Sequence, residues 1–333
     1  MNKPPPSVTV IIAARPNQKE ILAVAAARKL EYPPELLEII VARGNQPSRQ
    51  RNEAWRAARG ELIYFLDDDS MPPKGNLLYI ADHFSDDKVK LVGGPNLCPP
   101  DATQQEKIFV LVLGSWLAFG PSRARYKRIG KEPRESSEKE LILCNLIVRR
   151  ASLLKFGGFN EELYPNEENA LMDDIQKAGG KALYDPEFIV WRRPRKDRKL
   201  FIKMLKTYGR GRAEQFRLNP TFGSTLNFVP LLFCFYLLAL IVLELLPLGN
   251  SFAPLKLYAA APLAVYFVAI ILQTLALIPA GGIGRSLQAV PWLVATHLFY
   301  GYGFWRGLFT EVNRSGKEDS EDSDKVFLEY LQR

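Results

Sequence analysis

The amino-acid sequence predicts an α/β domain with a Rossmann-like, mostly parallel sheet, followed by a C-terminal α-helical transmembrane region. Three observations lead to this expectation. Short apolar strands alternate with helical segments through residues 1–192, an aspartate triplet directly follows one of these strands, and the chain becomes sharply apolar from Leu226 onward. Strands and helices that alternate with short connections are typical of a parallel sheet covered by helices on both faces.

The expected strands are short, apolar and rich in β-branched residues, which is the pattern of buried strands. They span residues 8–14, 36–42, 61–66, 89–92 and 141–148. The expected helices span residues 19–30, 48–58, 75–84 and 168–178. In such folds ligands collect at the carboxyl ends of the strands, and the aspartate triplet falls at one of these ends.

One stretch interrupts the alternation. Residues 108–119 are apolar, whereas residues 123–139 are polar and basic. We expect the second part to form a mobile loop near the ligand site. The strand pattern then resumes at residue 141.

The C-terminal region begins with a basic amphipathic segment and ends with a polar, acidic tail. The expected parts are residues 193–220 (basic segment), 221–310 (about three apolar helices, at 226–246, 255–278 and 287–309) and 311–333 (tail). The first two apolar helices are long enough to cross a hydrocarbon core of roughly 30 Å. The third contains Gln288, Pro291 and His297, so it could cross the bilayer, lie at its surface or pack against the other two, and two crossings remain an alternative.

The formal net charge of +8 is concentrated in one segment. Residues 191–217 contain eleven Lys or Arg and two acidic residues. Such a block could bind nucleic acid or phospholipid headgroups, but its place before an apolar segment favours the membrane surface, so we expect no nucleic-acid partner. Residues 199–216 are amphipathic, as in an interfacial helix, and a surface helix packed on the domain is the alternative.

Cysteine and histidine usage limits the possible metal sites. The three cysteines are widely spaced and there are two histidines, so the sequence has neither a disulfide framework nor a zinc pattern. Any metal must be held mainly by oxygen, which points to Mg²⁺ or Mn²⁺. Residues 1–6 are polar and proline-rich, unlike a signal peptide, so we expect the first domain to stay in the cytosol.

The strongest candidate site is the aspartate triplet Asp67, Asp68 and Asp69. Three adjacent carboxylates at the end of a strand repel one another unless a cation or hydrogen-bond donors compensate their charge. A hard divalent cation together with a diphosphate would do so. A solvated acidic turn is the alternative, but the position directly after a buried strand favours a functional site.

Two further patterns lie at the starts of expected helices. Arg51 and Asn52 belong to a segment in which arginine and a helix N-terminus suit phosphate or nucleotide oxygens, although it could be an ordinary charged first turn. Glu167 and Glu168 could serve the dipole of their helix. Alternatively, one of them is a general base that removes a proton from an acceptor hydroxyl, with its pKa raised by the neighbouring carboxylate.

The last pattern is the run Tyr208-Gly209-Arg210-Gly211-Arg212. Its glycines would allow close approach, and its arginines could hold a diphosphate. A structural role at the membrane surface is the alternative.

In their order along residues 7–217, these patterns resemble glycosyltransferase family 2, a group of inverting enzymes with the GT-A fold. The resemblance rests on an apolar first strand, the Arg51-Asn52 helix and the run ending in Asp67-Asp68-Asp69. It continues with Gly157-Gly158-Phe159-Asn160-Glu161-Glu162 and then Asn166-Glu167-Glu168-Asn169. The Tyr-Gly-Arg-Gly-Arg run and the apolar C-terminal region are most similar to the membrane-bound polysaccharide branch of succinoglycan-type transferases.

The resemblance implies a role for each matching position. Asp67 and Asp69 match the DxD pair, with Asp69 as a metal ligand and Asp67 at the nucleotide ribose or the metal. Glu168 matches the catalytic base, and Glu167 the acid before it. The implied donor-binding residues are Ala13, Arg15, Arg43, Arg51, Asn52, Asp67, Asp68, Arg210 and Arg212.

The implied activity is transfer of a sugar, with inversion, from a nucleotide sugar to a lipid-linked saccharide or polyprenyl phosphate at the cytoplasmic membrane. The family favours a UDP-sugar as donor. Three positions depart from the family's pattern: Arg43 stands where an acid usually helps to hold the base, Asp174 replaces a frequent Arg, and the expected base is Glu instead of Asp. A processive polysaccharide synthase and a non-catalytic membrane scaffold with a decayed transferase domain remain alternatives.

Overall fold

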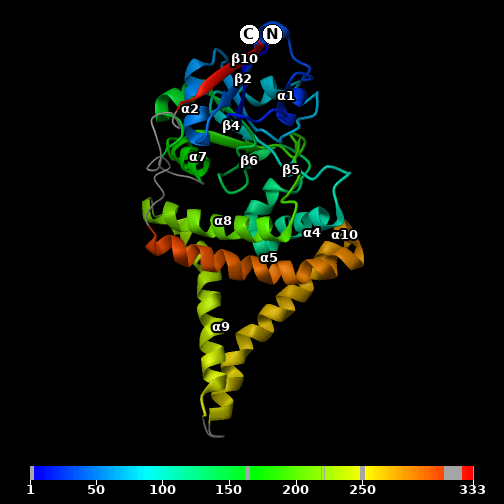
Figure 1. Cartoon of the computed structure of the whole chain (residues 1–333), viewed down its shortest axis with the longest axis vertical. Coiled ribbons are helices and arrows are strands. Elements are labelled where there is room, and N and C mark those ends of the chain that lie inside the picture. Colours follow the sequence, from blue (N-terminus) through cyan, green and yellow to red (C-terminus); the bar gives the residue numbers. More distant parts are fainter. Residues whose placement is uncertain are drawn as a thin grey trace. The chain divides into compact units, whose positions relative to one another are not determined.

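The computed structural model describes residues 4–161, 166–218, 220, 222–247, 252–310 and 325–332, whose elements are labelled in Figure 1. It contains two compact units. The sheet unit consists of Met1–Pro100, Pro121–Arg193 and Asn313–Arg333, and the helical unit consists of Asp101–Gly120 and Pro194–Val312. The sequence placed one boundary near residue 193. The structure assigns residues 101–120 to the helical unit as well, and it returns residues 325–332 to the sheet unit.

The sheet unit is built on an eight-stranded sheet with the order β10-β2-β1-β3-β7-β4-β8-β6. Its strands are β1 (Val8–Ala14), β2 (Leu37–Arg43), β3 (Leu62–Asp67), β4 (Val89–Gly93), β6 (Arg134–Ser136), β7 (Asn145–Arg149), β8 (Lys181–Tyr184) and β10 (Phe327–Gln332). Strands β1, β2, β3, β4 and β8 run in one direction, and β6, β7 and β10 run in the other. The predicted α/β fold is therefore confirmed, with a mixed sheet whose main direction is parallel.

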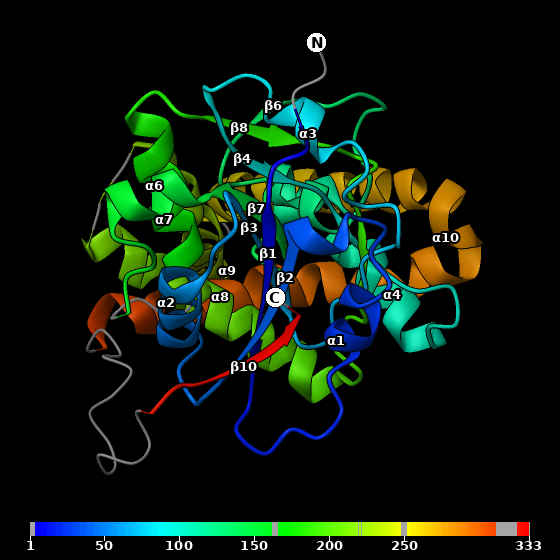
Figure 2. The same ribbon diagram turned by 90° about the horizontal axis from the view of Figure 1, so that it is seen from above.

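Strand β1 lies between β2 and β3 and is covered on both faces (Figure 2). Val10 and Ile12 belong to the apolar cluster on one face, and Ile11 belongs to the cluster on the other. All three side chains are fully buried, which explains why the strand is a continuous apolar run instead of an alternating one. Burial on both faces fixes the register of β1 and hence the position of its carboxyl end.

The helices of the sheet unit are α1 (Leu22–Ala27), α2 (Pro47–Ala57), α3 (Ile80–His83), α6 (Arg150–Phe156) and α7 (Glu167–Lys177). The helices expected at 19–30 and 75–84 are thus shorter than predicted. A small second sheet pairs β5 (Asn96–Leu97) with β9 (Val190–Trp191).

The segment expected to be a mobile loop, residues 123–139, contains regular structure. It begins in the 3-10 turn Gly120–Arg125, and its later part forms β6 on the edge of β8. An ion pair of 2.6 Å between Arg134 and Glu140 and the stacking of the Arg134 guanidinium over Tyr184 hold this edge strand. Part of this polar segment therefore forms an edge strand, and the charge of Arg134 is paired within the unit.

The helical unit contains α4 (Gln104–Leu113), α5 (Trp116–Phe119), α8 (Arg198–Leu218), a 3-10 segment (Phe222–Phe228), α9 (Val229–Leu245) and α10 (Ala253–Phe309). Helix α10 is broken at Gly282, which has φ 70° and ψ 167°. Within this unit, α9 and the first arm of α10 lead away from α8, and the second arm of α10 runs back along α8 (Figure 1).

Small residues allow α8 and the second arm of α10 to pack closely. A methyl group at Gly209 would overlap the backbone of Tyr300, and one at Gly303 would overlap the backbone of Lys206. At Gly307 it would lie 2.5 Å from the backbone oxygen of Arg210. Gly209, expected to allow a phosphate to approach, thus allows a neighbouring helix to approach instead.

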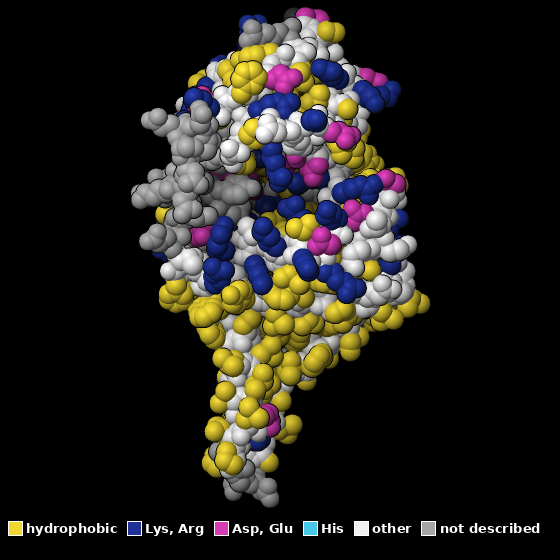
Figure 3. Space-filling model, in the orientation of Figure 1, with side chains coloured by type: hydrophobic (Ala, Val, Ile, Leu, Met, Phe, Trp, Pro, Cys, Tyr) yellow, Lys and Arg dark blue, Asp and Glu magenta, His cyan; other side chains and the backbone are white. Residues whose placement is uncertain are grey.

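Two helices of the described chain, Thr225–Leu245 and Ala253–Phe309, are long and apolar enough to cross a membrane. Hydrophobic side chains cover α9 and the first arm of α10, while a row of Lys and Arg follows α8 (Figure 3). Leu232, Leu257 and Val265 are each at least 60% exposed. The segment at 287–309 differs, because Ala289, Leu293 and Phe304 of the second arm are buried within the unit.

The C-terminal strand β10 was not expected. It pairs antiparallel with β2, with Phe327 opposite Arg43 and Glu329 opposite Val41. Leu328 and Tyr330 pack against the core of the sheet unit. Most of the predicted acidic tail, residues 311–324, lies outside the described residues.

Candidate active site

The aspartate triplet lies at the carboxyl end of β3. Strand pairing places Asp67 beside Ala13 of β1, and the backbone nitrogen of Ser70 donates to the carbonyl oxygen of Asp67 at 3.0 Å. The carbonyl oxygen of Asp68 accepts from the backbone nitrogen of Ala23 at 3.1 Å, which ties the turn to α1. The predicted position of the triplet at a strand end is therefore confirmed.

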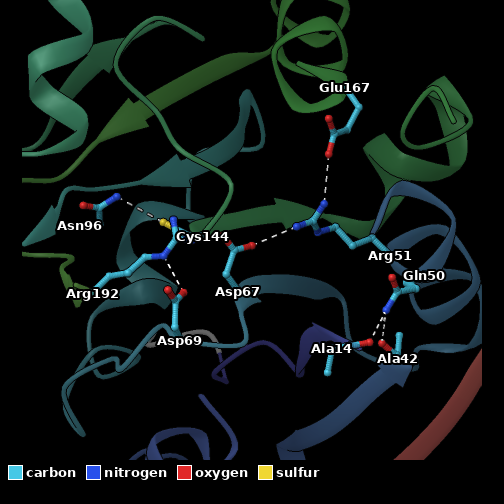
Figure 4. Close-up of polar contacts among 10 residues, drawn as sticks. All are labelled: Ala14, Ala42, Gln50, Arg51, Asp67, Asp69, Asn96, Cys144, Glu167 and Arg192. Carbon is cyan, nitrogen blue, oxygen red and sulfur yellow. Dashed lines mark hydrogen bonds and ion pairs between the residues drawn. The ribbon is translucent and has the colours of Figure 1, made fainter. Parts of the chain in front are cut away.

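Arg51 of α2 connects the triplet to the glutamate pair. Its Nη2 donates to Asp67 Oδ1 at 3.0 Å, and its Nη1 donates to Glu167 Oε1 at 3.1 Å (Figure 4). The side chain is buried. Arg51 thus brings the two acidic motifs to one place.

Arg192 approaches the triplet from the end of β9. Its Nε donates to Asp69 Oδ1 at 2.6 Å, and its Nη2 lies 3.0 Å from Asp67 Oδ2 (Figure 4). The sequence counted Arg192 as the first charge of the basic block and missed this contact. The signal that could have identified Arg192 is its position directly after the extended residues Val190 and Trp191. Ligand-binding residues collect at the ends of strands.

Backbone pairing fixes the position of Arg192. Trp191 and Met71 exchange two backbone hydrogen bonds, each 2.9 Å long, and the backbone nitrogen of Arg192 donates to the carbonyl oxygen of Leu97 at 2.8 Å. The side chain therefore starts from a rigid site next to the triplet.

A buried polar network holds Tyr64 of β3, which precedes the aspartate triplet. Tyr64 of β3 donates to Asn145 Oδ1 at 2.8 Å, and Asn145 Nδ2 donates to the carbonyl oxygen of Phe188 at 2.6 Å. Asn76 Nδ2 donates to the carbonyl oxygen of Ile189 at 2.7 Å. Buried networks of this kind specify one backbone arrangement. No pattern in the sequence predicts this network, because its members are far apart along the chain.

The glutamate pair opens α7, and its two carboxyl groups have different surroundings. Glu167 is buried, and its Oε2 has no hydrogen-bond partner among the described residues. Burial, together with the nearby charge of Glu168, raises the pKa of Glu167 to about 8 against the opposing effect of Arg51. Glu168 is partly exposed, so it is the one open to a ligand. Tyr164 and Pro165 lie outside the described residues.

The residue before this helix has an unusual backbone. Asn166 has φ 102°, in the left-handed region, and it is buried. Its Oδ1 accepts from Asn169 Nδ2 at 3.0 Å. Asparagine tolerates this conformation better than most residues, and such strain often occurs at functional sites.

Asn52 is occupied within the protein. Its Nδ2 donates to the carbonyl oxygen of Phe159 and to Glu161 Oε1, both at 2.8 Å, and its Oδ1 accepts from Phe159 N at 2.9 Å. A side chain at Gly158 would lie 2.5 Å from Asn52 Oδ1 and 2.6 Å from Trp55 Nε1. Asn52 and Gly158 thus fix the glycine-rich turn, and the expected contact of Asn52 with the donor stays a prediction.

The arginines at the ends of β1 and β2 contact the protein itself. Arg43 Nη1 donates to the carbonyl oxygen of Gln18 at 2.9 Å, and its Nε donates to Glu329 Oε2 of β10 at 3.1 Å. The carbonyl oxygen of Arg15 lies 3.5 Å from Arg43 Nη1. The buried Gln50, which the sequence did not single out, donates to the carbonyl oxygens that end β1 and β2.

Arg210 and Arg212 belong to the helical unit, and each has a partner on its own helix. Arg210 Nε is 3.3 Å from Glu214 Oε1, and Arg212 Nη1 donates to Gln215 Oε1 at 3.0 Å. Their expected contact with a diphosphate stays a prediction.

The residues predicted as metal ligands have a suitable arrangement. Asp67 Oδ2 and Asp69 Oδ1 converge on one cationic group, the Arg192 guanidinium. Burial raises the pKa of Asp69, and Arg192 opposes that rise. The described residues contain no cluster of three or more His, Cys, Asp or Glu suited to a metal. However, Mg²⁺ is commonly bound by one or two carboxylates together with substrate phosphates and water, so this pair fits such an ion.

Comparisons with solved structures show the same fold. A mannosyltransferase from Pyrobaculum calidifontis, in complex with GDP-Man and Mn²⁺, is 16% identical over 87% of each chain, with a TM-score of 0.56. Residues 1–349 of S. aureus TarS are 14% identical over 89% of each chain, with a TM-score of 0.45. Because the second score is below 0.5, only the mannosyltransferase supports the GT-A fold.

The sequence comparisons are more specific. No curated protein matches this chain. The family model described as "Glycosyltransferase like family 2" matches residues 1–210, which is more than half of the chain. The succinoglycan-type branch has no such support. The chain belongs to glycosyltransferase-like family 2.

Proposed function

We propose that this protein is a membrane-anchored, inverting glycosyltransferase that moves one sugar from a nucleotide sugar to a lipid-linked saccharide or polyprenyl phosphate. One observation carries the proposal: Arg51 bonds both Asp67, in the triplet expected to meet the donor, and Glu167, in the pair expected to serve the acceptor. A transferase needs a donor site and a base at a fixed separation. A buried guanidinium that bonds both motifs supplies that constraint.

On the donor side, Asp67 and Asp69 would hold Mg²⁺ or Mn²⁺. Such an ion, when bound, neutralises charge that develops on the leaving diphosphate. Ala13, Arg15 and Asp68 lie at or next to the carboxyl ends of the same strands, whereas Arg43 bonds Gln18 and Glu329. A uridine nucleotide is the first base to test, and guanosine is the second because the similar mannosyltransferase holds GDP-Man.

On the acceptor side, Glu168 would act as the base. The acceptor hydroxyl loses its proton to the Glu168 carboxylate while its oxygen bonds to the anomeric carbon, and the bond from that carbon to the diphosphate oxygen breaks. Attack from the face opposite the leaving group inverts the configuration. Glu167 is buried against Arg51, so we assign it to positioning.

The membrane part of the proposal rests on the exposed apolar surface of α9 and the first arm of α10. Monomeric soluble proteins rarely leave so large an apolar surface in water. The pairing of β10 with β2 puts residues 325–332 on the same side of the membrane as the sheet unit, which favours an even number of crossings. We therefore propose two crossings, with the second arm of α10 lying beside α8 at the cytoplasmic surface, instead of three.

The test of this function is the variant Glu168→Gln in the full-length protein in detergent. Loss of the base should lower the rate of sugar transfer about 10²- to 10⁴-fold while leaving the affinity for the nucleoside diphosphate unchanged. Glu53→Gln, an exposed change on α2, is the control and should keep both. Near-normal transfer by Glu168→Gln would show that another group is the base.

A further inference from the structure

We propose that Arg192 has two successive partners in the donor site. Before the donor binds, its guanidinium acts as an internal cation that holds Asp67 and Asp69 together. When a divalent cation enters between these carboxylates, Arg192 turns to the diphosphate of the nucleotide sugar. The inference rests on the proposed function, because it takes the donor site to be at the triplet.

The two contacts of Arg192 involve the two predicted metal ligands. Nε bonds Asp69 Oδ1 and Nη2 lies beside Asp67 Oδ2, so one planar group joins both carboxylates. The guanidinium therefore compensates the repulsion between two adjacent acids that would otherwise disfavour their ionised forms. One oxygen of each aspartate lies beside the same cation. A metal ion bound by both aspartates would also need one oxygen from each.

Asp67 shows why Arg192, and not Arg51, would be displaced. A cation that binds both Asp67 and Asp69 would compete with Arg192, which pairs with the same two carboxylates, whereas Arg51 pairs with Asp67 from the side of Glu167. Arg51 also holds the buried Glu167, which would lose its ion pair. Within the described chain the ion pairs of Arg192 go to the two aspartates, and a metal ion would compensate both carboxylates at once.

The backbone of Arg192 cannot follow the change, but its side chain can. Hydrogen bonds to Leu97 and between Trp191 and Met71 hold the backbone, so the guanidinium can only swing about its own bonds. A displaced guanidinium next to the triplet needs a new anion. Guanidinium groups bind phosphate oxygens through two parallel hydrogen bonds, and the donor brings its diphosphate to this place.

This exchange couples two binding events. Metal binding breaks the ion pairs of Arg192 with Asp67 and Asp69, and the diphosphate provides new ion pairs for its guanidinium. The metal should therefore bind weakly alone and more tightly with a nucleoside diphosphate, and the reciprocal effect on the nucleotide must have the same size.

The experiment measures Mn²⁺ binding to the full-length protein in detergent by electron paramagnetic resonance, with no nucleotide, with UDP and with GDP. Arg192→Gln should bind Mn²⁺ about tenfold more tightly than the wild type without nucleotide. It should also bind the nucleoside diphosphate about tenfold more weakly at saturating Mn²⁺. Each factor of ten corresponds to about 1.4 kcal/mol. Arg56→Gln, which removes an exposed arginine of α2, should change neither affinity.

Two results would overturn the inference. One is an unchanged or weaker Mn²⁺ affinity in Arg192→Gln, which would make Arg192 an organiser of the carboxylates. The other is a wild-type nucleotide affinity that is the same with Mn²⁺ and with a chelator, which would make Arg192 a permanent substitute for the metal. Arg192→Lys, which keeps the charge, gives the same comparison if the glutamine variant does not fold; its metal affinity should lie nearer the wild-type value.

Failure of the proposed function would look different. A wild-type protein that transfers no sugar to any acceptor, yet shows the predicted shifts in Mn²⁺ and nucleotide affinity, would refute the transferase and keep the exchange at Arg192. Normal transfer without those shifts would keep the proposed transferase and refute the exchange at Arg192.

Discussion

The two flanks of strand β1 each end in a residue that the sequence assigned to the donor site, Arg51 beside β3 and Arg43 at the end of β2, and the polar contacts on the two flanks differ. On the β3 flank, Arg51 and Arg192 bond carboxylates that a cation or diphosphate could also engage. On the β2 flank, Gln50 bonds backbone carbonyl oxygens, and Arg43 bonds β10. The first flank is arranged to exchange partners, whereas the second holds the sheet together. Substitutions on the first flank should therefore change metal or nucleotide binding, and also stability where a buried acid loses its cation, whereas substitutions on the second flank should change stability alone.

The largest effect is expected for Arg51→Met on the β3 flank. Above pH 8, where Glu167 is ionised, removing this guanidinium leaves a buried carboxylate without its ion pair, which should lower the free energy of unfolding by about 3 to 5 kcal/mol. The loss should shrink as the pH falls below about 8, because a protonated Glu167 no longer needs a cation. Urea unfolding in detergent, followed by circular dichroism, measures it against the exposed control Arg56→Met. Equal stability of the two variants would mean that Arg51 does not stabilise the pair.

A smaller effect is expected for Gln50→Leu on the β2 flank. Gln50 Nε2 donates to the carbonyl oxygens of Ala14 at 2.7 Å and Ala42 at 2.6 Å. The Ala14 oxygen would keep the backbone nitrogen of Gly44 as a donor at 3.1 Å, and losing the Gln50 amide from the two acceptors should cost about 1 to 3 kcal/mol of stability. At a temperature where the variant is folded, its Mn²⁺ affinity should match the wild type. A changed Mn²⁺ affinity would contradict the division between the flanks.

The pH dependence of the free energy of unfolding tests the raised pKa of Glu167 on the β3 flank. Burial raises the pKa of Glu167 from 4.5 to about 8, so the folded protein keeps this proton to higher pH than the unfolded chain. Stability from this group is present below the unfolded pKa and is lost as the pH rises towards 8. Relative to Glu167→Gln, the wild type should lose up to about 1.4 kcal/mol per pH unit within that window. Parallel pH profiles of the two proteins would contradict the raised pKa.

The smallest effect is expected for the ion pair between Arg43 and Glu329. Both side chains are partly exposed, so their coupling should be below about 1 kcal/mol. A double-mutant cycle with Arg43→Gln and Glu329→Gln measures it, and the nucleotide affinity should stay unchanged in all three variants. A nucleotide affinity that falls with Arg43→Gln alone would move Arg43 back to the donor site.

The sequence predicted what depends on neighbouring residues. The buried strands and the position of Asp67 at a strand end follow from local patterns of apolar and charged residues, whereas the different burial of Glu167 and Glu168 was not predicted. The same patterns, together with the order of the motifs, led to the family.

The sequence missed what depends on contacts between distant segments. Arg192 and Asp69 are 123 positions apart, and nothing in the basic block distinguishes this arginine from its neighbours. Residues 108–119 and 287–309 are apolar and pack within the helical unit. A hydropathy pattern does not distinguish such packing from insertion into a membrane. The strand β10 was hidden because its side chains pack on a sheet edge that exists only after folding.

Strand β10 also sets the order in which the protein can be completed. Arg43 and Glu329 are 286 positions apart, so at roughly 5 to 20 residues per second a ribosome needs roughly 15 to 60 s between them. Throughout that interval β2 has an open edge, which is a template for wrong pairing with other chains. The edge closes only after α9 and α10 have been synthesised and residues 325–332 have emerged on the side of the sheet unit. Under the proposed arrangement of two crossings, β2 therefore keeps an open edge until both helices have been synthesised.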